Sequence, residues 1–600
     1  MSDQREQEKL KFDPAEAARL YGEIATKSAE LLTRFMAKHA DGSAKPMADE
    51  LGISKAFFEA WGRMLSDPVR IAETQVKMWQ DYWSLWQSSM MKLMGQSAQP
   101  VAEAAHGDRR FKHEDWQGNF LYDYIKQSYL IAAKHLHASV AGVKGLDEQT
   151  AKKVDFYTRQ YIDALSPSNF VLTNPEVMRE TVASGGQNLV KGFANLLDDL
   201  TRGDGFKLRM TDETAFRLGE NIAVTPGKVV FQNELMQLIQ YSPTTAKVYQ
   251  RPLLIIPPWI NKYYILDLRE KNSFIKYAVE QGHTVFIVSW VNPGADFAGK
   301  TFEDYLNLGP LAALDAIERA TATRETNVIG FCLGGTLLAT ALGYLTAKGD
   351  TRVHSATFFA TLIDFEQAGE LGVFVDEGQV EALEKRMQER GYLEGSEMAT
   401  TFNMLRANDL IWSFVVNNYL LGRDPFPFDL LYWNSDSTRM PAAMHSYYLR
   451  NMYLRNLLAQ PGGLQLNGTP VDLTRVDIPL YFISTVEDHI APWKLCYRGA
   501  RLFKAPVRFV LGGSGHIAGI VNPPAANKYG YWTNETLAAT PEAWLEAASQ
   551  HAGSWWADWT RWSAEHGGAK VPARTPGEGG LAVIEDAPGW YVAVRAGSGK

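Results

Sequence analysis

From about residue 226 onward, short apolar runs alternate with segments of helical periodicity, and this alternation restricts the possible folds more than any other feature of the sequence. Such alternation is typical of a parallel β-sheet covered by helices. We expect helices near residues 304–320 and 336–348, between the strands. The sequence therefore predicts an α/β domain over residues 226–600, with strands at residues 253–256, 284–290, 327–330, 355–360, 480–484 and 507–511.

The regions outside these strands predict three further parts. Residues 1–225 have mostly helical periodicity and form a helical N-terminal domain. An insert at about 365–476, rich in aromatic residues and helix formers, interrupts the strand series where a cap or lid would be expected. A Gly- and Pro-rich stretch opens a C-terminal arm at about 567–600.

A stripe of large apolar residues marks one predicted helix of the N-terminal region. Spacings of three and four place its members on one helix face. The stripe is interpreted as a core or partner-helix face, or alternatively as a surface for an apolar polymer, a membrane or a protein partner. Its members are Val76, Trp79, Trp83, Trp86, Met90 and Met94.

Composition excludes several classes of protein. Of the 600 residues, 46% are hydrophobic, so a mainly disordered chain is excluded. Lys and Arg number 60 against 68 Asp and Glu, and the net charge of −8 argues against a nucleic-acid partner. Two cysteines, Cys332 and Cys496, cannot build a disulfide framework or a multi-thiolate metal site, so no metal is expected. No signal peptide or membrane-spanning run is recognised, which predicts a cytoplasmic location without a transmembrane segment.

The segment from Asn327 to Thr336 carries the strongest chemical signal. An apolar strand is followed by Gly-x-Cys-x-Gly and then by an Ala- and Leu-rich helix. This is the nucleophile-elbow pattern of the α/β-hydrolase fold, with Cys332 where most hydrolases have serine. A helix N-terminus favours the thiolate over the thiol. Cys332 is therefore the candidate nucleophile, although a buried structural cysteine in a glycine-rich turn is the alternative.

A nucleophile of this kind needs a base and an acid that orients the base. The elbow fold predicts the chain order nucleophile, acid, histidine. Asp488 and His516 each follow a predicted strand in that order and are the candidate acid and base. Glu487 is the rival acid and His489 the rival base.

Two backbone N–H groups should stabilise the oxyanion. The first belongs to Leu333, directly after the nucleophile. The second should come from the loop after strand 253–256, in which two prolines leave Trp259 and Ile260 as candidates, and Ile260 is preferred. No chemistry is assigned to Cys496, whose position suggests a core face.

Cysteine in place of serine favours acyl transfer from a thioester. A thiolate exchanges readily with a thioester, and the acyl-cysteine remains activated for attack by an alcohol. A slow hydrolase is also compatible with this nucleophile.

Long, specific motifs occur throughout the chain. They are Asp108-Arg109-Arg110-Phe111, the stretches 257–267, 289–293, 330–335 and 369–372, Tyr432-Trp433-Asn434-Ser435-Asp436, and the stretches 487–493 and 513–519. Together these motifs resemble those of the class I polyhydroxyalkanoate (PHA) synthases of the poly(3-hydroxybutyrate) polymerase type. The length and the large N-terminal region are similar to those of the single-subunit class.

The resemblance implies polymerisation of (R)-3-hydroxyacyl-CoA, typically 3-hydroxybutyryl-CoA, with release of CoA. The family's nucleophile, acid and base fall on Cys332, Asp488 and His516. Asp488 could act directly on the attacking hydroxyl or only orient His516. The CoA thioester is the substrate, and no cofactor is implied. A homodimer in contact with the growing polyester chain and the surface of PHA granules is implied as well.

Two other functions remain open at this point. One is a Cys-dependent thioesterase or PHA depolymerase on the same fold. The other is a non-catalytic granule-binding protein with a relic elbow.

Overall fold

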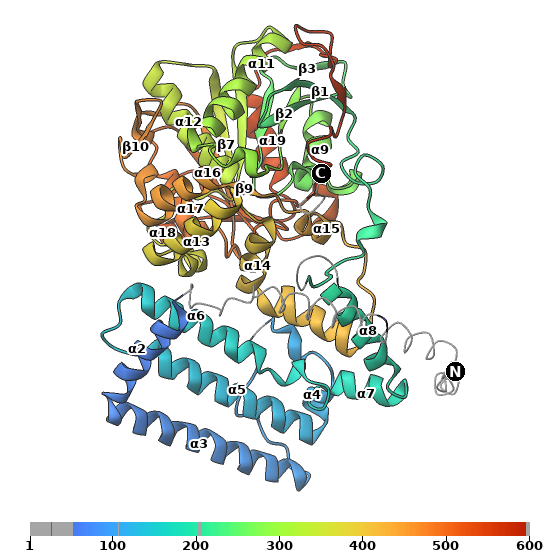
Figure 1. Cartoon of the computed structure of the whole chain (residues 1–600), viewed down its shortest axis with the longest axis vertical. Helices are drawn as coiled ribbons and strands as arrows, with labels where there is room; N and C mark the ends of the chain where they lie inside the picture. Colours follow the sequence, from blue (N-terminus) through green and yellow to red (C-terminus); the bar gives the residue numbers. More distant parts are fainter. Residues whose placement is uncertain (1–25, 27–51, 106, 202–206, 596–600) are drawn as a thin grey trace. The chain divides into compact units, whose positions relative to one another are not determined.

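The computed structural model describes residue 26 and residues 52–105, 107–201 and 207–595. The chain separates into two compact units, coloured along the sequence in Figure 1. The first comprises Met1–Asp212 together with Thr401–Phe426, and the second comprises Glu213–Thr400 together with Pro427–Lys600. The described part of the first unit is helical, and the second unit holds a large sheet.

The helices of the first unit begin at recognisable caps. Asp67 accepts a hydrogen bond from the Arg70 N–H at 3.1 Å in front of α3, and Pro68 occupies the first helical position. Asp147 caps α6 in the same way. The described elements are α2 (Ile53–Leu65), α3 (Pro68–Leu93), η1 (Arg109–Phe111), α4 (Asp115–Gly118), α5 (Phe120–Ala141), α6 (Glu148–Ala164), η2 (Pro167–Asn169), α7 (Pro175–Ala183), α8 (Gln187–Thr201), η9 (Asn408–Trp412) and η10 (Val415–Leu420).

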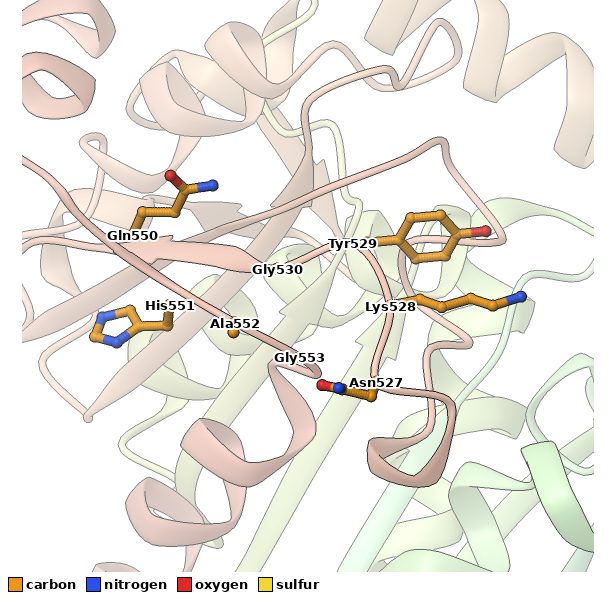
Figure 2. Close-up of a pocket in the computed structure, with 8 residues that line it drawn as sticks. All are labelled: Asn527, Lys528, Tyr529, Gly530, Gln550, His551, Ala552 and Gly553. Atoms are coloured by element: carbon orange, nitrogen blue, oxygen red, sulfur yellow. The ribbon is translucent and has the colours of Figure 1, made fainter.

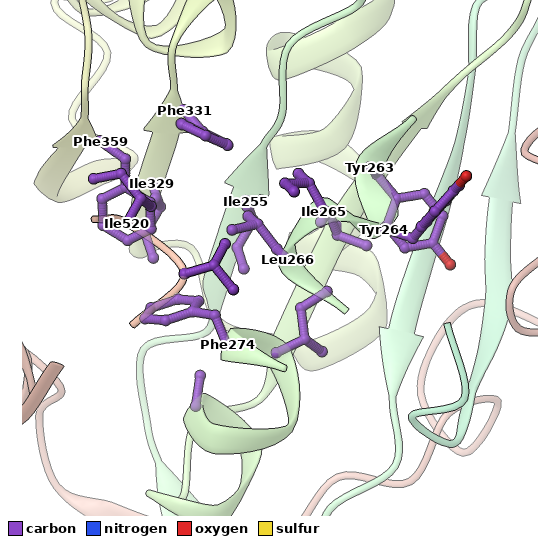
Figure 3. Packing of buried hydrophobic residues seen from close by; sticks show 14 of the residues in the cluster. Ile255, Tyr263, Tyr264, Ile265, Leu266, Phe274, Ile329, Phe331, Phe359 and Ile520 are labelled. Carbon is purple, nitrogen blue, oxygen red and sulfur yellow. The ribbon is translucent and has the colours of Figure 1, made fainter. Parts of the chain in front are cut away.

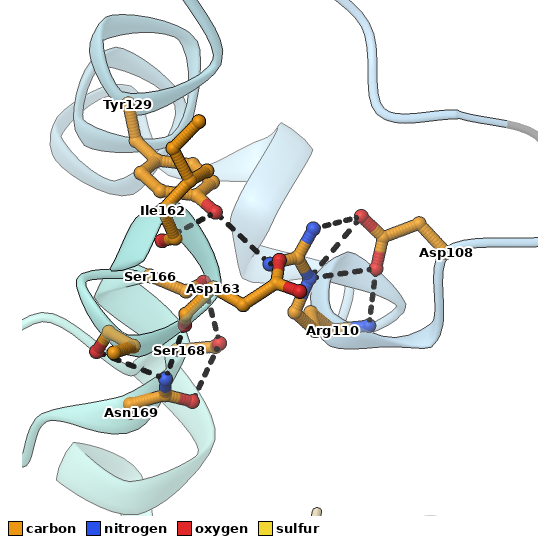
Figure 4. Close-up of polar contacts among 9 residues, drawn as sticks. Asp108, Arg110, Tyr129, Ile162, Asp163, Ser166, Ser168 and Asn169 are labelled. Carbon is orange, nitrogen blue, oxygen red and sulfur yellow. Dashed lines mark hydrogen bonds and ion pairs between the residues drawn. The ribbon is translucent and has the colours of Figure 1, made fainter. Parts of the chain in front are cut away.

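A half-buried arginine links three segments of this unit, as Figure 4 shows. Arg110 pairs with Asp108 at 2.9 Å and with Asp163 of α6 at 3.0 Å, and its guanidinium also donates to the Tyr129 hydroxyl of α5. Burial lowers the pKa of Arg110, but the hydrogen bonds that it donates to Asp108 and the neighbouring charges outweigh burial and raise that pKa. The Asp108-Arg109-Arg110-Phe111 motif therefore has a structural role in joining α5 and α6.

Part of the predicted insert packs in the first unit, against α8. The Tyr419 hydroxyl of η10 donates to Asp199 at 2.6 Å, and the Asn195 amide donates to the Asn418 carbonyl at 3.1 Å. A Cβ on Gly192 would lie 1.8 Å from the Tyr419 carbonyl oxygen, so α8 approaches η10 at a glycine. Residues 401–426 thus belong structurally with the N-terminal helices.

The second unit contains an eleven-stranded sheet in the order β15-β14-β13-β12-β7-β6-β4-β5-β2-β1-β17. The central strands are parallel and match the six predicted runs closely, although the strands at 285–290 and 353–359 differ by one or two residues from the predicted 284–290 and 355–360. Their residues are mostly apolar and almost all are buried, as expected for strands covered on both faces. They are β4 (Leu253–Ile256), β5 (Val285–Trp290), β6 (Thr326–Phe331), β7 (Val353–Phe359), β12 (Leu480–Thr485) and β13 (Val507–Gly512).

Five further strands extend the sheet antiparallel at its two edges, and the sequence patterns did not predict them. Three of them are only two or three residues long and the other two mix apolar with polar residues, so they lack the continuous apolar run of the central strands. They are β1 (Gly227–Gln232), β2 (Met236–Tyr241), β14 (Tyr531–Thr533), β15 (Ser549–His551) and β17 (Glu585–Asp586).

The helix predicted at 304–320 is interrupted. Gly309 has non-helical backbone angles and Pro310 lacks an N–H donor, so a π-helical turn, η7, separates two α-helices. The helices and short turns that accompany the sheet are η3 (Glu213–Ala215), η4 (Tyr263–Leu266), η5 (Glu270–Asn272), α9 (Phe274–Glu280), η6 (Ala295–Phe297), α10 (Phe302–Leu306), η7 (Asn307–Leu311), α11 (Ala312–Thr321), α12 (Leu333–Lys348), α17 (Trp493–Ala500), η14 (Pro524–Ala526), α18 (Pro541–Glu546) and α19 (Trp556–Glu565).

One face of the sheet packs into a continuous core, part of which Figure 3 shows. Ile255 of β4, Ile329 of β6 and Phe359 of β7 are completely buried, and Phe274 of α9 lies against them. Phe274 also meets the ring of Phe359 edge-on at 5.2 Å. The core therefore fixes β6, whose C-terminal end carries Cys332.

The remainder of the insert consists of short elements. These are η8 (Gly369–Phe374), α13 (Glu377–Arg390), β8 (Tyr392–Leu393), α14 (Gly395–Leu405), α15 (Asp429–Ser435), β9 (Met440–Pro441), α16 (Ala442–Tyr448), η11 (Leu449–Leu454), η12 (Leu457–Ala459), β10 (Leu464–Leu466), β11 (Thr469–Val471) and η13 (Leu473–Arg475).

The C-terminal arm is packed along the second unit as far as it is described. β16 (Lys570–Pro572) pairs with β3 (Lys247–Tyr249), and β17 pairs with β1. Tyr591 and Val592 are buried. Among the described residues, no helix is long and apolar enough to cross a bilayer.

Candidate active site

Cys332 lies at a sharp turn between β6 and α12. Its backbone has φ 52° and ψ −119°, an unusual conformation for a residue other than glycine. A Cβ on Gly330 would lie 2.5 Å from Gly335 Cα, and one on Gly334 would lie 2.0 Å from the Ile256 carbonyl oxygen. Only glycine fits at these positions, which explains the Gly-x-Cys-x-Gly spacing physically.

The Asp488 carboxylate is held by three hydrogen bonds. Oδ1 accepts the N–H groups of Ile490 and Ala491 at 2.9 and 2.8 Å. Oδ2 lies 2.7 Å from Nδ1 of His516. Both side chains are buried, in loops that follow β12 and β13 at the end of the sheet where β6 ends. The structure therefore brings together two of the residues that the sequence predicts for the site.

His516 also interacts with the Cys332 thiol, which completes a Cys–His–Asp arrangement. Burial lowers the pKa of the His516 imidazole, but the charges of Asp488 and Cys332 and the hydrogen bonds to both outweigh burial and raise that pKa to about 10. The ring of Phe331 stacks against the imidazole at 5.7 Å. At neutral pH the geometry thus favours a protonated imidazole beside the sulfur, a state that stabilises a thiolate.

The rival residues have different positions. Glu487 is exposed, and the carboxylate that meets His516 belongs to Asp488. His489 is half-buried on the turn after Asp488, and the imidazole bonded to the Asp488 carboxylate is that of His516. Cys496 is buried, its thiol donates to the Ala491 carbonyl at 3.4 Å, and burial raises its pKa.

The loop after β4 is held by its carbonyl groups. The Thr438 N–H donates to the Ile260 carbonyl at 3.0 Å, and the Trp433 indole donates to the Lys262 carbonyl at 2.6 Å. In the described ranges no protein acceptor is recorded for the N–H of Trp259 or Ile260. Both N–H groups stay candidates for the second oxyanion donor, and Leu333 lies in the first turn of α12, next to Cys332.

Two tyrosines of the insert, which the sequence interpretation missed, lie near the sulfur. Burial raises the pKa of both Tyr448 and Tyr453, and each phenol also interacts electrostatically with Cys332. Their rings meet at 5.7 Å, and the ring of Trp259 meets that of Tyr448 edge-on at 6.0 Å. The aromatic density of the insert was a signal for them, but nothing in the spacing connected these residues to Cys332.

Two further kinds of binding site lie outside the Cys332 region or are absent from the described residues. In the parts of the chain that the structure describes, no group of three or more His, Cys, Asp or Glu side chains could hold a metal ion. A pocket of about 440 Å³ lies beside β14 and β15, and Figure 2 shows residues 527–530 and 550–553 around it. None of the Cys332, Asp488 and His516 side chains lines this pocket.

Comparison with known proteins determines the family. The model "Poly-beta-hydroxybutyrate polymerase (PhaC) N-terminus" matches residues 107–278, and the model "alpha/beta hydrolase fold" matches residues 252–523. The "Poly(3-hydroxyalkanoate) polymerase subunit PhaC" of Rhizobium meliloti (strain 1021) is 49% identical over 99% of this chain and 96% of its own length. This chain belongs to the poly(3-hydroxyalkanoate) polymerase family. The resemblance predicted from the motifs is thereby confirmed.

Other polymerases of the family cover nearly as much of the chain. The enzyme of Methylorubrum extorquens is 49% identical over 90% of this chain and 89% of its own. That of Cupriavidus necator is 45% identical over 88% and 89%, respectively. A solved monoacylglycerol lipase of Paleococcus ferrophilus aligns with 55% of this chain and 99% of its own at 12% identity and a TM-score of 0.32. The α/β-hydrolase fold is assigned from the matching family model and the order of the sheet.

Proposed function

We propose that this polymerase converts (R)-3-hydroxyacyl-CoA, with 3-hydroxybutyryl-CoA as the preferred candidate, into polyhydroxyalkanoate through an acyl-Cys332 intermediate. The observation that carries the proposal is the Cys332–His516–Asp488 arrangement at the elbow of a chain that belongs to this family. Cys332 is the nucleophile, His516 the acid and base, and Asp488 the orienting acid.

In the first half-reaction, the Cys332 thiolate attacks the thioester carbonyl carbon. The N–H groups of Leu333 and Ile260 donate to the developing oxyanion. As the tetrahedral intermediate collapses, the carbon–sulfur bond to CoA breaks, and His516 supplies the proton that the leaving thiolate takes up. An acyl-Cys332 and free CoA result.

In the second half-reaction, the 3-hydroxyl of another acyl unit attacks the acyl-Cys332 carbonyl. The neutral imidazole of His516 accepts the hydroxyl proton, an ester bond forms, and Cys332 returns as the leaving thiolate beside the imidazolium. Both oxygens of Asp488 are already engaged, one by His516 and the other by two N–H groups. This supports an orienting role for Asp488 rather than direct contact with the hydroxyl.

The acyl enzyme must be protected from water, because hydrolysis would end chain growth. Asp488 and His516 are 6% and 5% exposed, and Tyr448 and Tyr453 add aromatic surface near the sulfur. These features support an acyl site that is enclosed and covered by the insert. Such a site favours polymerisation over hydrolysis.

We also propose that the protein works in the cytoplasm as a homodimer on the surface of PHA granules. The support for the granule surface is an aromatic ladder on α3, formed by Trp79, Trp83 and Trp86. These side chains are between 46% and 65% exposed, and their rings stack at 5.6 and 5.1 Å. An exposed patch of this kind fits an apolar surface such as a polyester.

The test is turnover of 3-hydroxybutyryl-CoA by the purified protein, with Cys332→Ala as the control. Release of CoA together with insoluble polyester is the expected result. Release of CoA with free hydroxy acid would instead identify a thioesterase or depolymerase. No CoA release at all would leave a non-catalytic granule protein.

A further inference from the structure

Lys262 is a buried cation that the reaction steps above do not use. It lies in the loop after β4, two residues beyond Ile260, and it is only 2% exposed. Its ammonium donates to the Val594 carbonyl at 2.7 Å and lies 3.5 Å from the Tyr591 carbonyl. The loop after β4 is thus tied to the end of the C-terminal arm.

The arm offers Lys262 a firm attachment because it is bound to the sheet independently. The Tyr591 hydroxyl donates to the Asn233 carbonyl at 2.7 Å, and the Tyr591 N–H donates to the Gln237 side chain at 3.2 Å. Val592 is completely buried. The Asn292 amide reaches the same Val594 carbonyl at 3.3 Å. The carbonyls that accept the Lys262 ammonium are therefore also held in place by contacts that do not involve Lys262.

The charged groups around Lys262 fit a structural cation. Asp436 attracts it and the guanidinium of Arg595 opposes it, while burial has the largest effect and lowers the pKa of Lys262 to about 8. Asp436 accepts the Tyr264 hydroxyl at 2.8 Å. Burying a charged ammonium costs desolvation energy, so its hydrogen bonds to the arm must offset part of that cost.

The loop is thus held from two sides. Thr438 and Trp433 bind the carbonyls of Ile260 and Lys262 from one side, and the arm binds the Lys262 side chain from the other. A peptide between two such attachments has little freedom to rotate, and an oxyanion donor needs an orientation that is fixed in advance.

We propose that Lys262 is a positioning residue that fixes the Trp259–Ile260 N–H groups for oxyanion stabilisation by tethering their loop to the Tyr591–Val594 carbonyls. The inference rests on the proposed function, since it assumes that an oxyanion forms at this loop.

The test compares Lys262→Met, which keeps the length of the side chain but removes its donors, with Lys262→Arg, which keeps donors and charge. Lys228→Met is the matched control: Lys228 binds the same arm through Asp586 at 2.5 Å, but from the exposed side of β1. Turnover of 3-hydroxybutyryl-CoA, alkylation of Cys332 by iodoacetamide and the melting temperature are measured for each variant.

Lys262→Met should lower kcat at least about tenfold, a smaller effect than the roughly 10²–10³-fold loss caused by removing an oxyanion donor outright, because the donor is misplaced and not lost. KM should change less than about twofold, and the alkylation rate should stay at the wild-type value, because alkylation needs the thiolate but no oxyanion. Lys262→Arg should regain most of the kcat, and Lys228→Met should match the wild type.

An unchanged kcat in folded Lys262→Met would overturn the inference, as would a parallel fall of kcat and alkylation rate, which would indicate general damage to the site. Should Lys262→Met fail to fold, Asn292→Asp is used, because its carboxylate repels the Val594 carbonyl and can still accept the Arg439 N–H. A wild-type kcat in that variant would also overturn it. Failure of the proposed function is distinguishable, since the wild-type protein itself would then not turn over the thioester.

Discussion

One oxygen of the Asp488 carboxylate lies 2.7 Å from Nδ1 of His516, and the other oxygen accepts hydrogen bonds from two backbone N–H groups. This arrangement fixes the imidazole ring and leaves its second nitrogen for Cys332. The pKa of His516 is consequently raised, against the effect of burial, which favours an imidazolium beside Cys332 at neutral pH.

Removal of the Cys332 sulfur should abolish turnover. We expect Cys332→Ala to lower CoA release by at least about 10³-fold with little change in melting temperature, because the covalent step is lost. Cys496→Ala is the matched control: Cys496 is buried and should be dispensable for catalysis. Iodoacetamide should label Cys496→Ala once per chain and leave Cys332→Ala unlabelled; the reverse pattern would contradict the assignment.

Alkylation kinetics can show which of His516 and His489 acts as the base. His516→Gln should slow the reaction of Cys332 with iodoacetamide at pH 7 by about tenfold or more, because the thiolate loses its imidazolium partner. His489→Gln should leave that rate nearly unchanged. The opposite ranking of the two variants would make His489 the base.

Stability should depend on pH through His516. Its pKa is raised from 6.5 to about 10 in the folded protein, so this group's contribution to stability is complete below about pH 6.5 and is lost as pH rises through about 10. Beside a Cys332 thiolate, the proton that the imidazole gains is offset by the proton that the thiol has lost, up to the ordinary thiol pKa of about 8.5. The folded state therefore holds an extra proton between about pH 8.5 and 10, where the free energy of unfolding should fall by up to about 1.4 kcal/mol per pH unit. Denaturant unfolding of the wild type and His516→Gln at several pH values from about 8.5 to 10 measures this, and equal slopes would refute it.

The glycine at 334 should tolerate no side chain. A Cβ there would lie 2.0 Å from the Ile256 carbonyl oxygen, so Gly334→Ala should displace β4 or α12 and lower both the melting temperature and the turnover. Gly378→Ala is the control: this residue is exposed in α13, and alanine should stabilise the helix by about 0.5–1 kcal/mol. Thermal unfolding that ranks the two variants equally would argue against a tight elbow.

The aromatic ladder of α3 should affect binding to granules and not chemistry. Replacing Trp79, Trp83 and Trp86 together with serine should reduce sedimentation of the protein with polyester granules several-fold, because the apolar area available for contact is lost. CoA release from soluble substrate should remain near the wild-type value. Trp590→Ser, a single exposed tryptophan of the second unit, is the control. Full granule binding by the triple variant would exclude this surface.

Much of the fold could be predicted from sequence because its signals are local. The central strands are short, continuous apolar runs between breakers, and β4 has the predicted bounds. The glycines around Cys332 also predict the elbow from local sequence, because the close backbone contacts of the turn leave no room for a Cβ at these positions. The strands β1, β2, β14, β15 and β17 escaped prediction because they are very short or contain polar residues and so lack a continuous apolar run, although β2 is buried throughout.

Other features depend on contacts between distant residues. Asp488 and Glu487 are adjacent, and only the path of the turn decides which carboxylate faces His516. Tyr448 and Tyr453 reach the surroundings of Cys332 through the fold of the insert, and residues 401–426 pack on α8 rather than within the second unit. Lys262 binds carbonyls more than 300 residues away. Local sequence determined the strands, the elbow and the candidate chemistry, because backbone geometry and burial act over a few residues; tertiary structure decided which side chains meet, because that requires the whole chain to pack.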